Sequence, residues 1–388
     1  MNSDQSRAEM LLVLLRAALG NDISEAEGLL SSTAPINWAE IYRYAAEHGV
    51  LAIAWDGINA LYNSGKLSAE QMPARALKLQ WALSSERIEQ KYSRQQHLAE
   101  ELSAKLASQG LATFVLKGLS ISRYYPIPNH RECGDLDCFF SVTSDDKPTI
   151  ATTNERGLPI SGYDKGNKLA AEIGAKVGIG FYKHSHITYK GLTIENHQFC
   201  TAVRGSKRRK ALERHIQELL TSRKGAFIGE SKLIAPCADF NALFLTAHSV
   251  SHFMTEGIRL RHIIDWAVLL KHEEANIDWD SFYSWCDRMR YTKFVNALNT
   301  IAVRYLGFAY NSDKICRESE YAERVLDDVL HKSTSIHNTK ASKFQKRLMI
   351  IKARMLGNWK YRELCNTSAF VDLLQTITAF FIERKPKI

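Results

Sequence analysis

The sequence has 388 residues, of which 45% are hydrophobic, and this is ample material for the packed core of a globular protein of two or three domains. The longest apolar runs near either end contain Arg16 or Asp372 and are shorter than the roughly 18 residues of a membrane-spanning helix. A net charge of +9 at pH 7 suits an anionic ligand, such as a nucleotide or a nucleic acid.

Two further absences narrow the class of protein. The chain does not open on a basic segment followed by an apolar run and a cleavage site, so we expect a cytoplasmic protein without a membrane span. The seven cysteines are scattered and form no CxxC pair, which argues against a disulfide framework and against a cysteine zinc site. We expect them to be reduced and mostly structural.

Helical periodicity dominates the first part of the chain, where apolar residues recur at spacings of three and four. The pattern predicts helices over 10–19, 36–62 and 72–109. Asn37, with Glu40 three positions later, predicts the start of the second helix through a capping box. We expect residues 1–110 to form an N-terminal helical region.

Short apolar segments and turn residues alternate in the next part of the chain. They predict strands over 111–118 and 135–142, separated by a short helix and by a loop that Pro126 and Pro128 stiffen. A β-hairpin is expected over 185–199, with Lys190-Gly191 at its turn.

The remaining periodicity is helical. A helix is predicted over 168–178, and the helical pattern returns after 201 and continues almost to the end. The expected fold class is α+β: a core over 111–200 with a small mixed or antiparallel sheet, flanked by the N-terminal helices and by a C-terminal helical domain over 201–388.

The acidic residues of the second predicted strand carry the strongest chemical signal. Asp135 and Asp137 are two residues apart on a buried strand and therefore point to the same face. Like charges held side by side are costly unless a cation lies between them. In the later hairpin Thr193, Glu195 and His197 alternate onto one face, which makes Glu195 the expected third carboxylate of a divalent-metal site for Mg²⁺ or Mn²⁺.

The segment before this strand offers groups for phosphate binding. Lys117-Gly118 ends the first strand and opens the short helix, so a lysine and backbone amides can meet a phosphate there. Arg131, in the loop before Asp135, can add a bidentate guanidinium.

Together these positions resemble a family of uncharacterised bacterial nucleotidyltransferases within the polymerase β-like superfamily. The resemblance rests on Lys117-Gly118, Tyr125-Pro126, Arg131, the Gly134–Asp137 segment and the Glu195–His197 segment, and it reaches a helix over 257–270. It implies a nucleotidyltransferase core that moves a nucleoside monophosphate from an NTP to an acceptor hydroxyl and releases pyrophosphate.

The resemblance also implies roles for single residues. Asp135, Asp137 and Glu195 are expected to hold the metal ions and to be catalytic, and Lys117, Gly118 and Arg131 to bind phosphates. Ser120 is also expected to bind the nucleotide, although it is one place later than the serine of the superfamily's Gly-Ser turn. Arg261 and Asp265 would border the nucleotide, although their spacing also allows a simple ion pair on one helix. His197 would orient a ligand or a carboxylate, or it could lie at the sheet edge with its hydrogen bonds already satisfied.

Several alternatives stay open at this stage. A metal-dependent glycosyltransferase also uses an Asp-x-Asp pair, and a non-catalytic nucleotide-binding or regulatory partner could keep the carboxylates without turnover. The acceptor can be a small hydroxyl compound, a tRNA or a protein. The basic runs 204–214 and 343–362 are either solvated helix faces or nucleic-acid contacts. The spacing of His248 and His252, four residues apart, permits metal binding, but we expect them rather to line the core or to act as caps.

Overall fold

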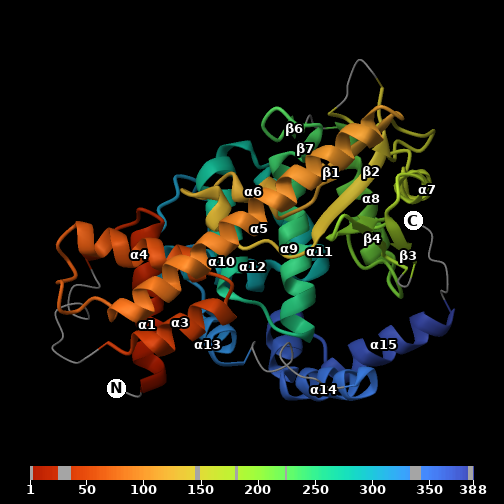
Figure 1. Cartoon of the computed structure of the whole chain (residues 1–388). Coiled ribbons are helices and arrows are strands. Elements are labelled where there is room, and N and C mark those ends of the chain that lie inside the picture. The colour runs from red at the N-terminus through yellow and green to blue at the C-terminus, as the bar shows by residue number, and fades with distance from the viewer. Residues whose placement is uncertain are drawn as a thin grey trace.

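The computed structural model describes residues 3–24, 36–144, 149–179, 182–222, 225–332, 342–382 and 388. Within these described ranges, four helices precede the first strand: α1 (Ser3–Ala18), α3 (Trp38–Glu47), α4 (Leu51–Asn63) and α5 (Arg75–Ala107). The N-terminal region is therefore helical as predicted, and α5 is the long helix that runs diagonally across the molecule (Figure 1).

The predicted helix over 36–62 is wrong in one respect, because it is two helices. Gly49 adopts a positive φ of 66° between α3 and α4, a conformation that ends the first helix. The predicted start is confirmed, since the Asn37 side chain accepts a hydrogen bond from the Glu40 backbone N–H. A Cβ on Gly57 of α4 would lie 2.0 Å from the Leu14 carbonyl oxygen, so this glycine permits the close packing of α1 on α4.

The described part of the chain then forms one mixed sheet of seven strands, in the order β3-β4-β5-β2-β1-β7-β6. Its strands are β1 (Leu111–Val115), β2 (Leu136–Val142), β3 (Lys176–Gly178), β4 (His184–Tyr189), β5 (Leu192–His197), β6 (Ala226–Phe227) and β7 (Leu233–Ala235). β2 is parallel to β5 and β1 is parallel to β7, whereas the other pairs are antiparallel. The expected α+β class with a mixed sheet is thus confirmed.

Two details of the sheet differ from the prediction. The helix expected over 168–178 is α7 (Tyr163–Glu172), which begins earlier, and Gly174 with a φ of 88° ends it so that 176–178 form β3. Two strands, β6 and β7, lie beyond residue 200, in a stretch for which the periodicity predicted only helices. They are only two and three residues long, too short to give a periodic signal.

Helices cover both faces of the sheet (Figure 1). On one face α5 and α7 pack Leu102, Leu106 and Ala170 against Leu136, Cys138 and Ile194 of the strands. On the other face Phe114 and Phe139 join the main core together with the C-terminal helices. These helices are α8 (Lys207–Ser222), α9 (Ala238–Thr255), α10 (Leu260–Glu273), α11 (Trp279–Met289), α12 (Thr292–Arg304) and α13 (Ala322–Lys332).

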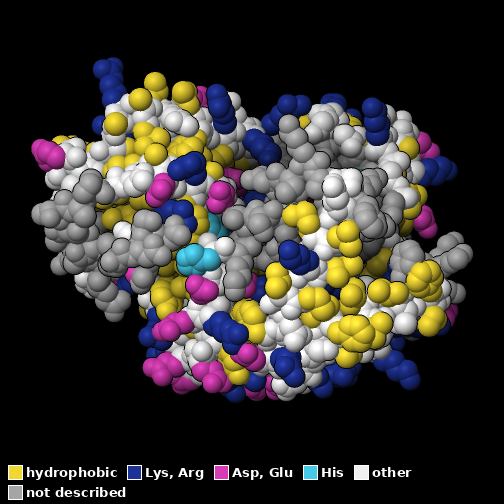
Figure 2. Space-filling model, turned by 90° about the horizontal axis from the view of Figure 1, so that it is seen from below, with side chains coloured by type: hydrophobic (Ala, Val, Ile, Leu, Met, Phe, Trp, Pro, Cys, Tyr) yellow, Lys and Arg dark blue, Asp and Glu magenta, His cyan; other side chains and the backbone are white. Residues whose placement is uncertain are grey.

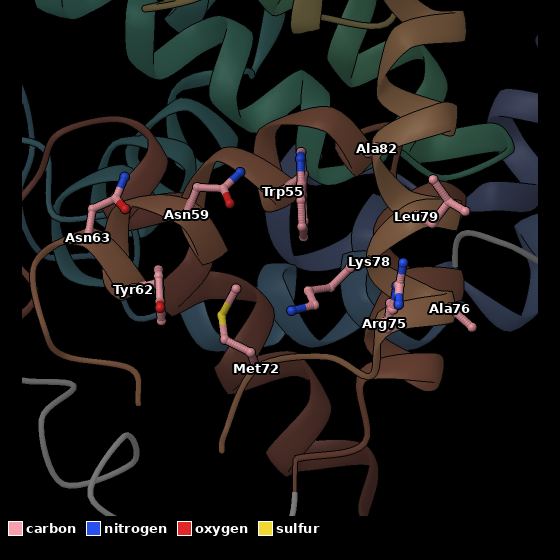
Figure 3. Close-up of a pocket in the computed structure, with 10 residues that line it drawn as sticks. All are labelled: Trp55, Asn59, Tyr62, Asn63, Met72, Arg75, Ala76, Lys78, Leu79 and Ala82. Carbon is pink, nitrogen blue, oxygen red and sulfur yellow. The ribbon is translucent and has the colours of Figure 1, made fainter. Parts of the chain in front are cut away.

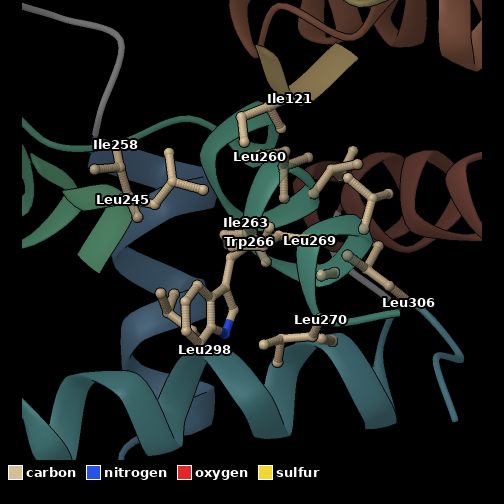
Figure 4. Packing of buried hydrophobic residues seen from close by; sticks show 14 of the residues in the cluster. Ile121, Leu245, Ile258, Leu260, Ile263, Trp266, Leu269, Leu270, Leu298 and Leu306 are labelled. Carbon is tan, nitrogen blue, oxygen red and sulfur yellow. The ribbon is translucent and has the colours of Figure 1, made fainter. Parts of the chain in front are cut away.

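The centre of this core is α10, which is apolar around most of its circumference (Figure 4). Its Trp266 is 1% exposed and donates its indole N–H to Asn299 Oδ1 at 2.8 Å. Ile121, from the short helix α6 (Leu119–Ser122) that follows β1, packs into the same cluster. The end of β1 is therefore fixed to the helical core.

The last two helices, α14 (Lys343–Leu356) and α15 (Ala369–Ile382), lie together at the bottom of the molecule (Figure 1). Viewed from below, apolar side chains gather on this part of the surface (Figure 2), and α15 exposes Phe370, Leu374, Ile377 and Phe381. Asp372, which interrupts the apolar run, pairs with Arg209 of α8 at 3.1 Å and Arg354 of α14 at 3.7 Å. Among the described residues, no helix has the length and apolar character to cross a membrane.

Candidate metal and nucleotide site

The parallel pairing of β2 with β5 brings the predicted carboxylates together. Asp137 stands opposite Glu195 in the register, and His197 lies two residues further along β5 on the same face as Glu195. Asp135 comes directly before β2, two residues ahead of Asp137. Asp135 is exposed, and its pKa is raised by partial burial and by the negative charges of Glu195 and Asp137. A raised pKa from clustered like charges marks a place where a cation would be stabilised.

Asp137 is the buried member of the cluster. Its Oδ1 lies 3.1 Å from His197 Nε2, and its Oδ2 forms an ion pair with Lys117 Nζ at 3.2 Å. Burial would raise the pKa of this carboxyl, but Lys117 and His197 outweigh that effect and hold the pKa well below its usual range. Asp137 is therefore ionised, with the lysine as the cation closest to it.

Backbone conformation places Lys117. The next residue, Gly118, has φ 71° and ψ −110°, values that residues with a Cβ rarely adopt. α6 then forms as predicted, although it is a single turn, and Ser120 within it is fully buried with a hydroxyl that has no hydrogen-bond partner among the described residues. The Lys117 side chain extends from the end of β1 to α9, where its Nζ lies 2.9 Å from His248 Nε2.

Sequence reasoning missed several basic and imidazole groups around these carboxylates. Lys183, just before β4, has its pKa lowered by burial, while the nearby Asp137 favours its charged form. His248 was expected only to line the core, but burial and the charge of Lys117 lower its pKa well below normal, so it is neutral and can accept a hydrogen bond from the lysine. Neither residue has a fixed spacing from Asp135, and pattern reading therefore could not find them.

The hairpin that carries Glu195 is held from the opposite side of the sheet. The Asn167 side-chain oxygen of α7 accepts hydrogen bonds from Ser185 Oγ at 2.6 Å and from Asn196 Nδ2 at 3.0 Å. At the turn, Lys190 has φ 48° and its ammonium contacts Glu101 of α5 at 2.7 Å. The predicted hairpin and its Lys190-Gly191 turn are confirmed, and these bonds fix the register of the strand.

Three of the predicted nucleotide-binding residues form a second group. Arg131 and Asp265 are both buried and pair through Nε–Oδ1 at 2.7 Å and Nη2–Oδ2 at 2.6 Å. Tyr125 donates its hydroxyl to the same Oδ1 at 2.6 Å, and Arg261 Nη1 donates to the Glu132 carbonyl at 2.7 Å. The loop over 126–134 is thereby fastened to α10, and the charge of Arg131 is matched by Asp265.

A separate hollow of about 910 Å³ lies between α4 and the first turns of α5 (Figure 3). Trp55, Tyr62, Met72, Lys78 and Leu79 are among its lining residues. None of the carboxylates lines it, and its wall is mainly apolar. The groups suited to phosphate and metal chemistry are those on the sheet.

The donor set at the sheet fits a divalent cation. One ligand atom from each of Asp137, Glu195 and His197 lies within 4.8 Å of the other two, and Asp135 is coupled to the same group by charge. Carboxylate oxygens are the ligands that Mg²⁺ and Mn²⁺ prefer in phosphoryl-transfer sites. The residues present therefore agree with the metal that this class of site implies.

A mixed sheet that carries clustered carboxylates beside two lysines, flanked by helices, is consistent with a nucleotidyltransferase domain. The uncharacterised nucleotidyltransferase family matches residues 34–307, which is more than half of the sequence, and the chain belongs to this family. The match runs from the segment before α3 to the residues after α12 and includes the whole sheet. No curated protein and no solved structure matches the chain. Membership of the family makes nucleotidyl transfer the general kind of reaction, with a nucleotide as substrate.

Proposed function

We propose that the chain transfers a nucleoside monophosphate from an NTP to an acceptor hydroxyl and releases pyrophosphate, with Asp135, Asp137 and Glu195 as the ligands of Mg²⁺ or Mn²⁺. One observation carries the proposal: Asp137 and Glu195, which are 58 positions apart in the sequence, stand opposite each other in the β2–β5 register. Partial burial, together with the charges of these two residues, raises the pKa of Asp135. Bound metal ions would neutralise the triphosphate and lower the pKa of the acceptor hydroxyl.

The surrounding residues supply binding and orientation. Lys117 Nζ is shared between Asp137 and His248, so a triphosphate oxygen can replace either contact without moving the lysine far. Lys183 adds a second half-buried ammonium, and its lowered pKa reflects the desolvation that an incoming anion would offset. Glu195 is half-buried and can accept the proton that leaves the acceptor hydroxyl.

A structural role is proposed for Arg131, Asp265 and Arg261, which do not contact the nucleotide in this account. We assign them to holding the loop before Asp135 against α10, because the bidentate pair uses both oxygens of Asp265. His197 orients Asp137 through the 3.1 Å contact of its Nε2. Phosphate contacts then fall to Lys117, Gly118, Ser120 and Lys183, of which Ser120 contributes a buried hydroxyl that still has bonding capacity.

The acceptor surface is proposed from charge. Lys207, Arg208 and Arg214 of α8 are exposed, which leaves part of the basic run 204–214 available to an RNA or another polyanion. Arg209 in the same run is engaged by Asp372. Of the second run, 343–362, the side chains at 343, 344, 346 and 347 lie outside the described residues, and Lys352 is exposed.

Thermal unfolding in the presence of nucleotides tests the proposal. An NTP with Mg²⁺ should raise the melting temperature of the wild type and of Asp313→Asn, an exposed carboxylate in a distant turn, but not of Asp135→Asn. Asp135 suits the test because it is exposed, so the variant keeps the fold. Stabilisation by nucleotide-sugars alone would replace the proposal with glycosyl transfer, and no stabilisation by any nucleotide would favour a non-catalytic partner.

A further inference from the structure

The hairpin presents three metal-ligating side chains on the face that carries Glu195. His184 and His186 are two residues apart on β4 and point the same way, and the register places His186 opposite Glu195. One ligand atom from each of the three lies within 4.8 Å of the other two. His184 Nε2 is 3.6 Å from Glu195 Oε2, and the rings of His184 and His186 are 4.9 Å apart.

The donor chemistry of this group differs from that of the aspartates. Two imidazole nitrogens and one carboxylate oxygen suit Zn²⁺ and related transition-metal ions, whereas Mg²⁺ prefers oxygen ligands in an octahedral arrangement. Bonds of about 2.0–2.1 Å to a tetrahedral ion place ligand atoms roughly 3.3 Å apart. Rotation about the side-chain bonds can close the present separations to that value.

The site is also open on one side. His186 is exposed, while the side chains of His184 and Glu195 are 13% and 21% exposed, so an ion can enter and can retain water as a further ligand. His197 stands behind the group: its Nε2 is 3.1 Å from Asp137 and 3.5 Å from Glu195 Oε2. Such a neighbour orients the carboxylate ligand.

We propose that His184, His186 and Glu195 bind a Zn²⁺-class transition-metal ion next to the aspartate pair. The ion would share Glu195 with the proposed Mg²⁺ site. It would supply, at the edge of the nucleotide site, a Lewis acid that prefers nitrogen ligands. The inference rests on the proposed function only for the place of the ion in the reaction, and the binding itself is measured without turnover.

Cobalt(II) titration of the full chain provides the test, because a protein-bound Co²⁺ ion with nitrogen ligands absorbs visible light and Zn²⁺ competes for the same donors. The wild type should bind one Co²⁺ that Zn²⁺ displaces and Mg²⁺ at the same concentration does not. His186→Ala should weaken Co²⁺ binding by at least about tenfold, since even residues that only support metal ligands contribute that much. His97→Ala is the matched control, because His97 is an exposed histidine of α5 outside the group.

Variants at the aspartates separate this inference from the proposed function. Asp135→Asn should keep the Co²⁺ affinity of the wild type while losing NTP stabilisation. Equal Co²⁺ affinity in His186→Ala, His184→Gln and the wild type would overturn the inference, as would loss of Co²⁺ binding in Asp135→Asn to the same degree as in His186→Ala. Retained Co²⁺ binding in a chain that no NTP stabilises would instead overturn the proposed function alone.

Discussion

Replacement of Asp265 by asparagine should destabilise the protein strongly. The aspartate accepts two hydrogen bonds from Arg131 and one from Tyr125, and both ionised side chains are about 5% exposed. Asparagine keeps one acceptor oxygen and turns an N–H₂ group toward the guanidinium, which leaves a buried charge without compensation. Removal of one partner from such a pair costs about 3–5 kcal/mol.

A second cation adds to this cost. Arg261 is half-buried near Arg131, and its pKa is lowered by burial first and then by repulsion from Arg131, while Asp265 opposes the shift. Without the aspartate, both guanidinium groups lie close together without a buried carboxylate between them. We therefore expect the loss of unfolding free energy in Asp265→Asn to lie at the upper end of the range of about 3–5 kcal/mol.

Urea denaturation followed by tryptophan fluorescence measures the change in the free energy of unfolding. Tyr125→Phe, which removes a single hydrogen bond to the carboxylate, should cost about 1.5–3 kcal/mol and provides the scale. The double variant Arg131→Met with Asp265→Leu removes both charges and should recover much of the loss. A cost below about 1 kcal/mol for Asp265→Asn, together with weakened nucleotide binding, would refute the structural role and return the pair to the nucleotide site.

Two further predictions concern residues in the segment between β1 and Asp135. Burial opposes the charge of His130, but Asp56 at 2.7 Å and Glu89 at 2.8 Å outweigh it and raise the pKa of the imidazole. Because the pKa is raised in the folded state, these two ion pairs contribute stability below about pH 6.5 and lose it as the pH rises through the folded-state pKa. In urea denaturation, His130→Asn should therefore lower the free energy of unfolding more at about pH 5.5 than at about pH 8.5. An equal cost at both pH values would contradict this. Gly118→Ala should lower the free energy of unfolding by about 1–3 kcal/mol, because a residue with a Cβ is strained at a φ of 71°. The control in the same urea assay is Gly134→Ala, whose Cβ would meet open space. Equal costs for the two variants would contradict the strain argument.

Alternation between neighbouring residues predicted the first two central strands, the hairpin and the carboxylates that they carry. Asp137 lies on β2, Asp135 comes directly before that strand, and the alternation of the 192–197 segment places Glu195 on a defined face, so period-two reasoning was sufficient there. The Lys190-Gly191 turn is likewise encoded by adjacent residues with positive φ.

The missed features depend on tertiary contacts. Lys183 lies directly before β4 and His248 lies on α9, so only the assembled fold brings the first near Asp137 and the second to the ammonium of Lys117. The pairing of Arg131 with Asp265 joins residues 134 positions apart, and nothing near either residue indicates the partner. β7 is three residues long and is defined by its parallel neighbour β1, which no periodicity within 233–235 could reveal.

Transfer of label from an NTP tests the central claim most directly. Each NTP is supplied with either an α- or a γ-phosphate label, together with Mg²⁺ and separate pools of small hydroxyl compounds, tRNA and protein. The account predicts that α-label enters one pool while γ-label leaves as pyrophosphate, and that Asp135→Asn and Glu195→Gln abolish the transfer. Transfer of γ-label to an acceptor, or undiminished transfer of α-label by either variant, would contradict it.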